Sequence, residues 1–98
     1  MVVNDLPFRE EVLEENENYI LVKREFDSHL DSKDLVWHRD KEDREIKVIS
    51  GVGWYLQIEN ELPVLFQQNI SYKINKEIWH RIINKKSTNL ILEIKKHK

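Results

Sequence analysis

Two histidines and one aspartate in this sequence have the types and the spacing of a metal-binding set. His38 and Asp40 stand two positions apart, so both side chains leave the same face if this segment is extended. His80 lies in a separate segment of strand-forming residues further along the chain. Two imidazoles and one carboxylate on one cavity wall suit a divalent ion such as Fe(II) and leave positions open for a ligand. The spacing by itself also allows the ordinary alternative. In that case the histidines lie on the surface, or lie in the core with their hydrogen bonds formed.

Both histidines stand in the same local context, because Trp37-His38-Arg39 and Trp79-His80-Arg81 share their three residue types. On extended strands the two-residue period sends His to one face and Trp and Arg to the other. If the imidazoles face an interior, the two indoles form an exposed apolar patch of a kind that soluble monomers seldom leave bare. Either the N-terminal segment or a second copy of the chain could cover this patch, and we expect a homodimer.

The segments that must position these residues have the pattern of short β-strands. Alternating or continuous apolar runs separated by turn residues occur at 19–26, 35–39, 46–49, 54–59, 62–66, 70–74, 78–83 and 90–94. Gly51 and Gly53 mark a turn or a bulge between two of them. Seven or eight short strands at this spacing predict an all-β sandwich or barrel.

The first eighteen residues have a different character and predict a short helical arm. Asp5 can cap a helix, Pro7 suits its first turn, and Glu10 would lie near the positive end of the helix dipole. We therefore divide the chain into an N-terminal arm at residues 1–18 and a β-barrel domain at residues 19–98.

Composition excludes several classes of protein. The 98 residues include 16 Lys and Arg, 18 Asp and Glu and no Cys, with a formal net charge of −2. This length predicts one domain, and the lack of cysteine excludes a disulfide scaffold. The charge argues against a general nucleic-acid binder, and no apolar run approaches the ~20 residues that span a bilayer. We expect a cytoplasmic protein with neither a nucleic-acid nor a membrane partner.

Over residues 21–94 the chain resembles the cupin family of small jelly-roll barrels. The first cupin motif runs Gly, five residues, His-x-His, three or four residues, Glu, six residues, Gly. Here Ser32 stands for the first Gly, His38-Arg39-Asp40 for His-x-His, and Gly51 for the last Gly. The departure is Asp40 in place of the second His, and a carboxylate can still bind a metal through oxygen.

The second cupin motif runs Gly, five residues, Pro-x-Gly, two residues, His, three residues, Asn. Here Asn69, Asn75 and Glu77 replace the Gly, Pro and Gly, whereas His80 and Asn84 match in both identity and spacing. The resemblance implies a small double-stranded β-helix barrel, which is a cupin-like jelly roll.

The resemblance also implies a function. It implies a divalent metal (Fe, Mn, Ni or Zn) held by His38, Asp40 and His80, with Glu45 as a fourth ligand, and a small polar molecule in the mouth of the barrel. If such a protein is an enzyme, the expected reaction is dioxygenation or isomerisation, with the metal as Lewis acid or oxygen activator.

The fourth ligand is ambiguous. Counting forward from Asp40 gives Glu45, whereas counting back from Gly51 gives Arg44, which cannot bind a cation. If Ile46 faces the interior, Arg44 does too and Glu45 faces solvent. An inward Arg44 could pair with Asp40 or bind an anionic ligand. The alternative function is therefore a metal-free module on the same barrel, which binds a small molecule or anion or serves in an interaction.

Gln57 is a further candidate for ligand contact, if its side chain reaches the cavity. It stands in an alternating segment, on the face opposite to Leu56 and Ile58. That position also allows a side chain that faces solvent.

Overall fold

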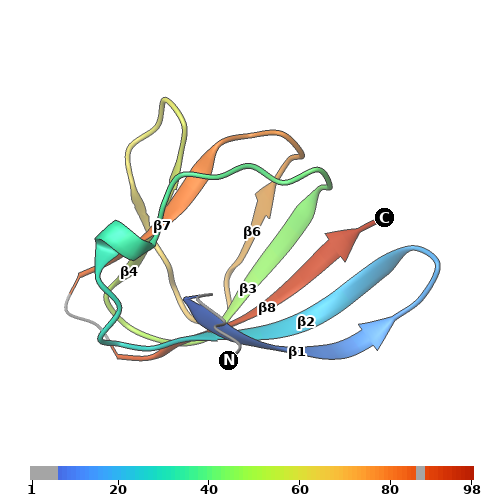
Figure 1. Ribbon diagram of the computed structural model, residues 1–98, viewed down its shortest axis with the longest axis horizontal. Helices are drawn as coiled ribbons and strands as arrows, with labels where there is room; N and C mark the ends of the chain where they lie inside the picture. The colour runs from blue at the N-terminus through green and yellow to red at the C-terminus, as the bar shows by residue number, and fades with distance from the viewer. Residues whose placement is uncertain (1–6, 86–87) are drawn as a thin grey trace, which may run out of the picture.

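The computed structural model describes residues 7–85 and 88–98, and their fold is all-β (Figure 1). One antiparallel sheet has the strand order β1-β2-β8-β3-β6, and the other has the order β5-β4-β7. The elements are β1 (Phe8–Glu15), β2 (Tyr19–Phe26), the 3₁₀ turn η1 (Ser32–Asp34), β3 (Arg44–Ser50), β4 (Trp54–Ile58), β5 (Val64–Leu65), β6 (Ser71–Ile74), β7 (His80–Asn84) and β8 (Leu90–His97). The all-β prediction is confirmed. In the described part of the chain, no helix has the length and apolar character needed to cross a membrane.

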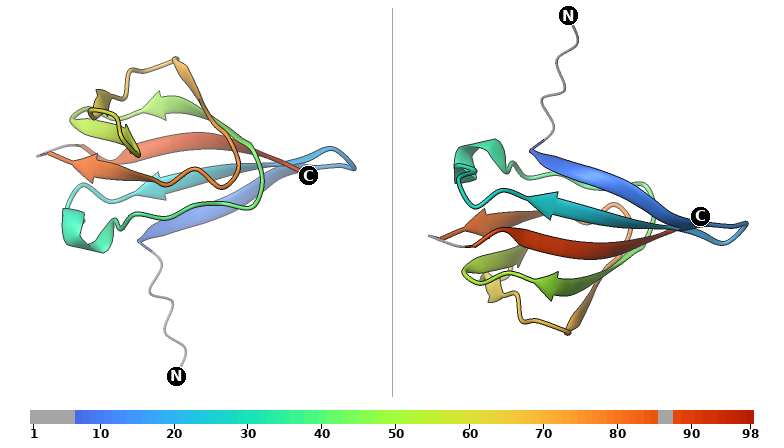
Figure 2. Two further views of the ribbon diagram at one scale, coloured as in Figure 1. Left: turned by 90° about the horizontal axis from the view of Figure 1, so that it is seen from above. Right: turned by 90° about the horizontal axis from the view of Figure 1, so that it is seen from below.

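The two sheets lie on either side of a shared interior (Figure 1). Seen from below, β1 lies at one edge beside β2, followed by β8 and then β3 (Figure 2). After η1, the segment 35–43 passes beside β7 and then enters β3 (Figure 1). This segment therefore links the small sheet to the large one, and it carries His38 and Asp40.

The core forms from the inward positions of strands that alternate in polarity. On β8 the side chains of Leu90, Leu92 and Ile94 are buried, and on β4 those of Trp54 and Leu56 are buried opposite them. Each such apolar side chain contributes roughly 1.5–3 kcal/mol when it is removed from water. A one-residue slip in register would turn this whole set outward, so burial pins the register of both sheets.

The predicted N-terminal helical arm is wrong. Residues Phe8–Glu15 form strand β1, which pairs antiparallel with β2 at the edge of the five-stranded sheet. The polar residues that follow form the hairpin turn, where Asn16 Oδ1 accepts hydrogen bonds from the backbone N–H groups of Asn18 (2.8 Å) and Tyr19 (3.0 Å). Residues 8–15 thus belong to the same sheet as residues 19–26.

Contacts across the strand pair explain why the local helix signals do not prevail. The Phe8 ring lies 5.4 Å from that of Phe26, and Arg24 Nε donates to Glu10 Oε1 at 2.8 Å. Cross-strand pairs contribute roughly 0.2–1 kcal/mol each, whereas a helix this short is marginal in water. Asp5, the predicted helix cap, lies outside the described residues.

The connection from β3 to β4 carries the chain from the large sheet to the small one. Gly51 has a φ of +134°, and a Cβ at this position would lie 2.9 Å from Leu90 Cδ1 and 3.0 Å from Asn89 O. The backbone therefore approaches β8 so closely that only glycine fits without displacement.

Candidate metal centre

His38 and His80 are brought together by backbone pairing. The N–H of His38 donates to the carbonyl of His80 at 3.0 Å, and the N–H of His80 donates to the carbonyl of His38 at 2.9 Å. The strand predicted at 35–39 is reduced to this single antiparallel bridge. Two residues that exchange both hydrogen bonds project their side chains to the same face. The two imidazole centroids accordingly lie 4.2 Å apart, with the rings inclined at 62°.

Each imidazole is oriented by a backbone carbonyl two residues before it. Nδ1 of His38 lies 3.1 Å from the carbonyl oxygen of Val36, and Nδ1 of His80 lies 2.8 Å from that of Ile78. A carbonyl only accepts, so in the neutral imidazole the proton is on Nδ1 and the lone pair is on Nε2. Metal-ligating histidines are commonly held in this way.

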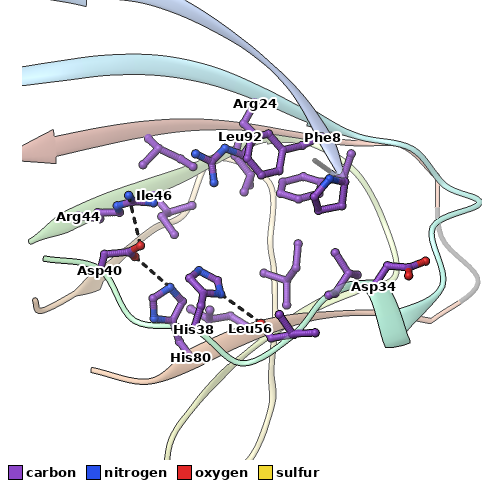
Figure 3. Close-up of a pocket in the computed structure, with 16 residues that line it drawn as sticks. Phe8, Arg24, Asp34, His38, Asp40, Arg44, Ile46, Leu56, His80 and Leu92 are labelled. Atoms are coloured by element: carbon purple, nitrogen blue, oxygen red, sulfur yellow. Dashed lines mark hydrogen bonds and ion pairs between the residues drawn. The ribbon is translucent and has the colours of Figure 1, made fainter. Parts of the chain in front are cut away.

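Asp40 completes the group. Its Oδ2 lies 3.3 Å from His80 Nε2, and its Oδ1 lies 3.2 Å from Arg44 Nη2 (Figure 3). Oδ2 is buried and accepts no hydrogen bond of good geometry from the described residues. With the His80 proton on Nδ1, the lone pairs of Nε2 and Oδ2 meet across this gap. Such a pair is stable in a buried place when a cation lies between its members.

The distances fit a metal ion. Metal–nitrogen and metal–oxygen bonds of about 2.0–2.2 Å place neighbouring ligands roughly 3.0–3.5 Å apart, and the His80–Asp40 separation of 3.3 Å falls in this range. One ligand atom from each of His38, Asp40 and His80 lies within 4.8 Å of the other two. Ion binding would therefore draw the three side chains slightly together. Two nitrogens and one oxygen suit Fe, Mn, Ni or Zn.

The protonation states also favour a cation. Although much of His38 is exposed, its desolvation lowers the pKa of the imidazole below the ordinary value, and this outweighs the opposing hydrogen bond to Val36. For Asp40, burial would raise the pKa of the carboxyl, but a hydrogen bond from His80, when its Nε2 carries a proton, and the charge of Arg44 outweigh burial and lower it. Near neutral pH the site thus presents a carboxylate and a neutral His38 imidazole, which are the forms that bind metals.

The three residues lie at the wall of a cavity of about 370 Å³ between the two sheets. Figure 3 shows Asp40 and Arg44 at one end of it and Phe8 and Asp34 toward the other. Apart from these groups and Arg24, the lining is apolar. Small-molecule sites have this size and this combination of apolar walls with a few convergent polar groups.

Glu45 does not join this group. Ile46 and Val48 of β3 are buried, so Arg44 lines the cavity while Glu45 is exposed on the outer face of the sheet. There the carboxylate of Glu45 lies 3.6 Å from Nε2 of His97. The proposal of Glu45 as fourth ligand is corrected by this alternation, since the side chain leaves the strand on the wrong side.

Gln57 does not line the cavity either. Its Oε1 accepts from Arg81 Nε at 2.9 Å, and its Nε2 donates to the carbonyl of Glu61 at 3.1 Å. The amide of Gln57 therefore forms hydrogen bonds to β7 and to the turn after β4, and it does not contact the cavity.

Sequence reasoning missed Arg24. It stands between Val22 and Phe26 on the inward face of β2, and its side chain is only 11% exposed. An arginine at an inward position of an otherwise apolar alternation was the available signal. Its partner Glu10 was missed as well, because the pairing depends on β1 being a strand.

Solved structures with the same architecture include several cupins. A cupin domain from Bordetella pertussis matches with a TM-score of 0.69 at 16% identity, covering 99% of each chain. An RmlC-like cupin from Shewanella frigidimarina matches with a TM-score of 0.77 at 15% identity, over 94% of this chain and 77% of that one. KdgF from Halomonas sp. matches with a TM-score of 0.74 at 12% identity, over 94% of this chain and 82% of that one.

No protein-family model and no curated protein matches the sequence. At the identities of the solved structures, the likeness concerns the fold. The strand order, the shared interior and these neighbours agree: the chain has the fold of the small single-domain cupins.

Proposed function

We propose that this protein is a metal-binding cupin that holds a small molecule in its cavity, as an isomerase or a dioxygenase. The observation that carries the proposal is the buried Oδ2 of Asp40, which has no hydrogen-bond donor among the described residues and faces Nε2 of His80 at 3.3 Å. A metal ion would satisfy both atoms, and His38 would supply a third ligand.

Some residues of the site would hold the ion, and others shape its surroundings. His38, Asp40 and His80 would hold the metal, which when bound supplies a Lewis acid or an oxygen activator. Arg44 holds Oδ1 of Asp40, so that Oδ2 is the oxygen left for the ion. The apolar walls exclude water and strengthen electrostatic interactions inside the cavity. Because one barrel supports many reactions, the reaction itself must be tested directly.

A second candidate function is favoured by the same contacts. If His80 is protonated, then His80, Asp40 and Arg44 form a continuous network of opposite charges that needs no ion. The cavity would then be a metal-free site for a small molecule or an anion.

Metal titration of the chelator-treated protein decides between the two. We expect one Fe(II), Mn(II), Ni(II) or Zn(II) per chain in calorimetry, and comparable metal in protein purified without a nickel column. The double variant His38→Ala, His80→Ala should lose this binding. His29→Ala is the matched control, because His29 is exposed and lies outside the cavity. A wild-type protein that binds none of these ions at micromolar concentration would leave the metal-free site as the function.

A further inference from the structure

Two arginines reach the cavity from two different strands of the large sheet. Arg24 comes from β2 and Arg44 from β3, and their side chains are 11% and 14% exposed (Figure 3). Placing a guanidinium at an inward position costs desolvation free energy, which an apolar residue there would avoid. Two such positions on one cavity wall indicate a function for the charge.

Each guanidinium is held by a glutamate along one edge. Nε of Arg24 donates to Glu10 Oε1 at 2.8 Å, and Nε and Nη2 of Arg44 donate to Glu42 Oε1 at 3.0 and 2.8 Å. These hydrogen bonds use Nε and Nη2, and Nη1 of neither arginine forms a hydrogen bond with the described residues. Since a guanidinium has five N–H donors, both retain donors for a further acceptor.

Arg24 is also fixed in place from another side. Its Cζ lies 3.8 Å from the centroid of the Phe8 ring, which itself lines the cavity. A guanidinium held between a carboxylate and an aromatic face has lost most of its freedom before any ligand arrives. Such preorganisation favours binding of an acceptor of matching shape.

The rest of the wall is apolar. It includes Phe8, Phe26, Leu56 and Ile82, and the described residues that line the cavity include no hydroxyl or amide side chain. A sugar or a polyol would leave its hydroxyl groups without partners in such a place. A ligand with one charged end and an apolar body would satisfy both parts of the wall.

The unused donors give the sign of that end. A guanidinium donates hydrogen bonds and cannot accept them, so the N–H groups of Arg24 and Arg44 that Glu10, Glu42 and Asp40 do not use need an acceptor. An anionic acceptor forms the stronger, charge-assisted hydrogen bonds.

We propose that the cavity binds a small organic carboxylate whose carboxylate accepts hydrogen bonds from Arg24 and Arg44 and whose apolar body lies against Phe8, Phe26, Leu56 and Ile82. The inference rests on the proposed function, because it names the class of molecule held beside the metal-binding residues. A planar carboxylate matches the geometry of a guanidinium.

The test uses the chelator-treated wild-type protein and phenylacetate, with binding followed by calorimetry. Phenylacetate should bind at least about tenfold more tightly than its neutral isostere phenylacetamide, because the amide cannot form charge-assisted hydrogen bonds. Acetate should also bind at least about tenfold more weakly, because it lacks the apolar body. Equal binding of the amide, or inorganic phosphate binding as tightly as phenylacetate, would overturn the proposal.

Matched variants locate the site. Arg24→Met should weaken phenylacetate binding about tenfold or more. Arg9→Met should leave it unchanged, because Arg9 is 67% exposed and forms its own cross-strand ion pair with Glu25 at 3.3 Å. Arg24→Lys keeps the charge without the planar donors and should bind with intermediate affinity, which covers the case in which Arg24→Met fails to fold. If the Arg24 and Arg9 variants changed phenylacetate affinity equally, the carboxylate would not bind at Arg24.

The metal titration separates the two hypotheses. If phenylacetate binds as expected but no metal does, the proposed metal function fails and the carboxylate site stands. If metal binds and phenylacetate has the same affinity as phenylacetamide, the carboxylate inference alone fails.

Discussion

Nε2 of His80 and Oδ2 of Asp40 lie 3.3 Å apart, and Oδ2 is buried without a hydrogen-bond partner among the described residues. If they share a metal ion, Asp40→Asn replaces the carboxylate by a weaker, neutral ligand. We expect metal affinity to fall by about 100-fold or more, since even loss of an outer partner costs 10–100-fold. Titration calorimetry on the chelator-treated variant measures this change.

Glu45→Gln is the matched control for that substitution. Its carboxylate lies on the outer face of β3 beside His97, so metal affinity should stay within about twofold of wild type. A large loss from Glu45→Gln, with little loss from Asp40→Asn, would mean that Glu45 binds the ion and Asp40 does not.

The stability of the metal-free protein should fall with decreasing pH. The pKa of His38 is below its ordinary value of 6.5, so beneath that pH the unfolded chain binds more protons than the folded one. The contribution of His38 to the free energy of unfolding is therefore fully present above pH 6.5. It decreases as the pH falls toward the lowered pKa. Asp40, whose pKa is lowered from 3.8, extends the loss to more acidic pH.

Urea unfolding between pH 7 and pH 5 checks this. His38→Asn should flatten the dependence in that range, whereas His29→Asn should keep the wild-type slope because His29 is exposed. An unchanged slope in His38→Asn would show that another group is responsible.

Phe8→Ala tests whether the N-terminal residues act as a strand. The Phe8 ring packs on Phe26 and under the Arg24 guanidinium, so its loss should destabilise the fold by about 1–3 kcal/mol, less than for a fully buried Phe. Val12→Ala is the control, because Val12 is 59% exposed on the same strand and should cost about 0.5 kcal/mol or less. Equal effects in urea unfolding would mean that β1 contributes no packing to the barrel.

The Trp37 and Trp79 indoles remain 39% and 41% exposed, because β1 joins the edge of the other sheet instead of covering them. In the His38–His80 pairing each indole meets the opposite guanidinium: Arg81 lies 4.8 Å from the Trp37 ring and Arg39 lies 5.2 Å from the Trp79 ring. We propose that a second copy of the chain covers this surface, since Trp and Arg are enriched in interface hot spots.

Sedimentation measures the proposed dimer. Trp79→Ala should raise the dimer dissociation constant by about tenfold or more. Val12→Ala should leave it unchanged, because Val12 is 59% exposed on β1, at the edge of the other sheet. A wild-type protein that sediments as a monomer at high concentration would exclude the dimer.

The amino-acid sequence by itself determines the alternation along single strands. The inward placement of Ile46 and Val48 follows from the two-residue period of an extended chain, and so does the placement of Arg44 on their face with Glu45 on the opposite one. The same period places His38 and Asp40 on one face. These relationships depend only on covalent geometry, which acts on neighbours in sequence.

The partners of each strand were decided by tertiary structure. Local patterns in residues 8–15 suited a helix, and only pairing with β2 made them a strand that brings Glu10 to Arg24. The meeting of His38 with His80 likewise depends on a single bridge between distant segments. Such contacts arise because burying apolar surface selects one register among many, and no residue near Arg24 or His38 in the sequence encodes which distant strand will lie beside it.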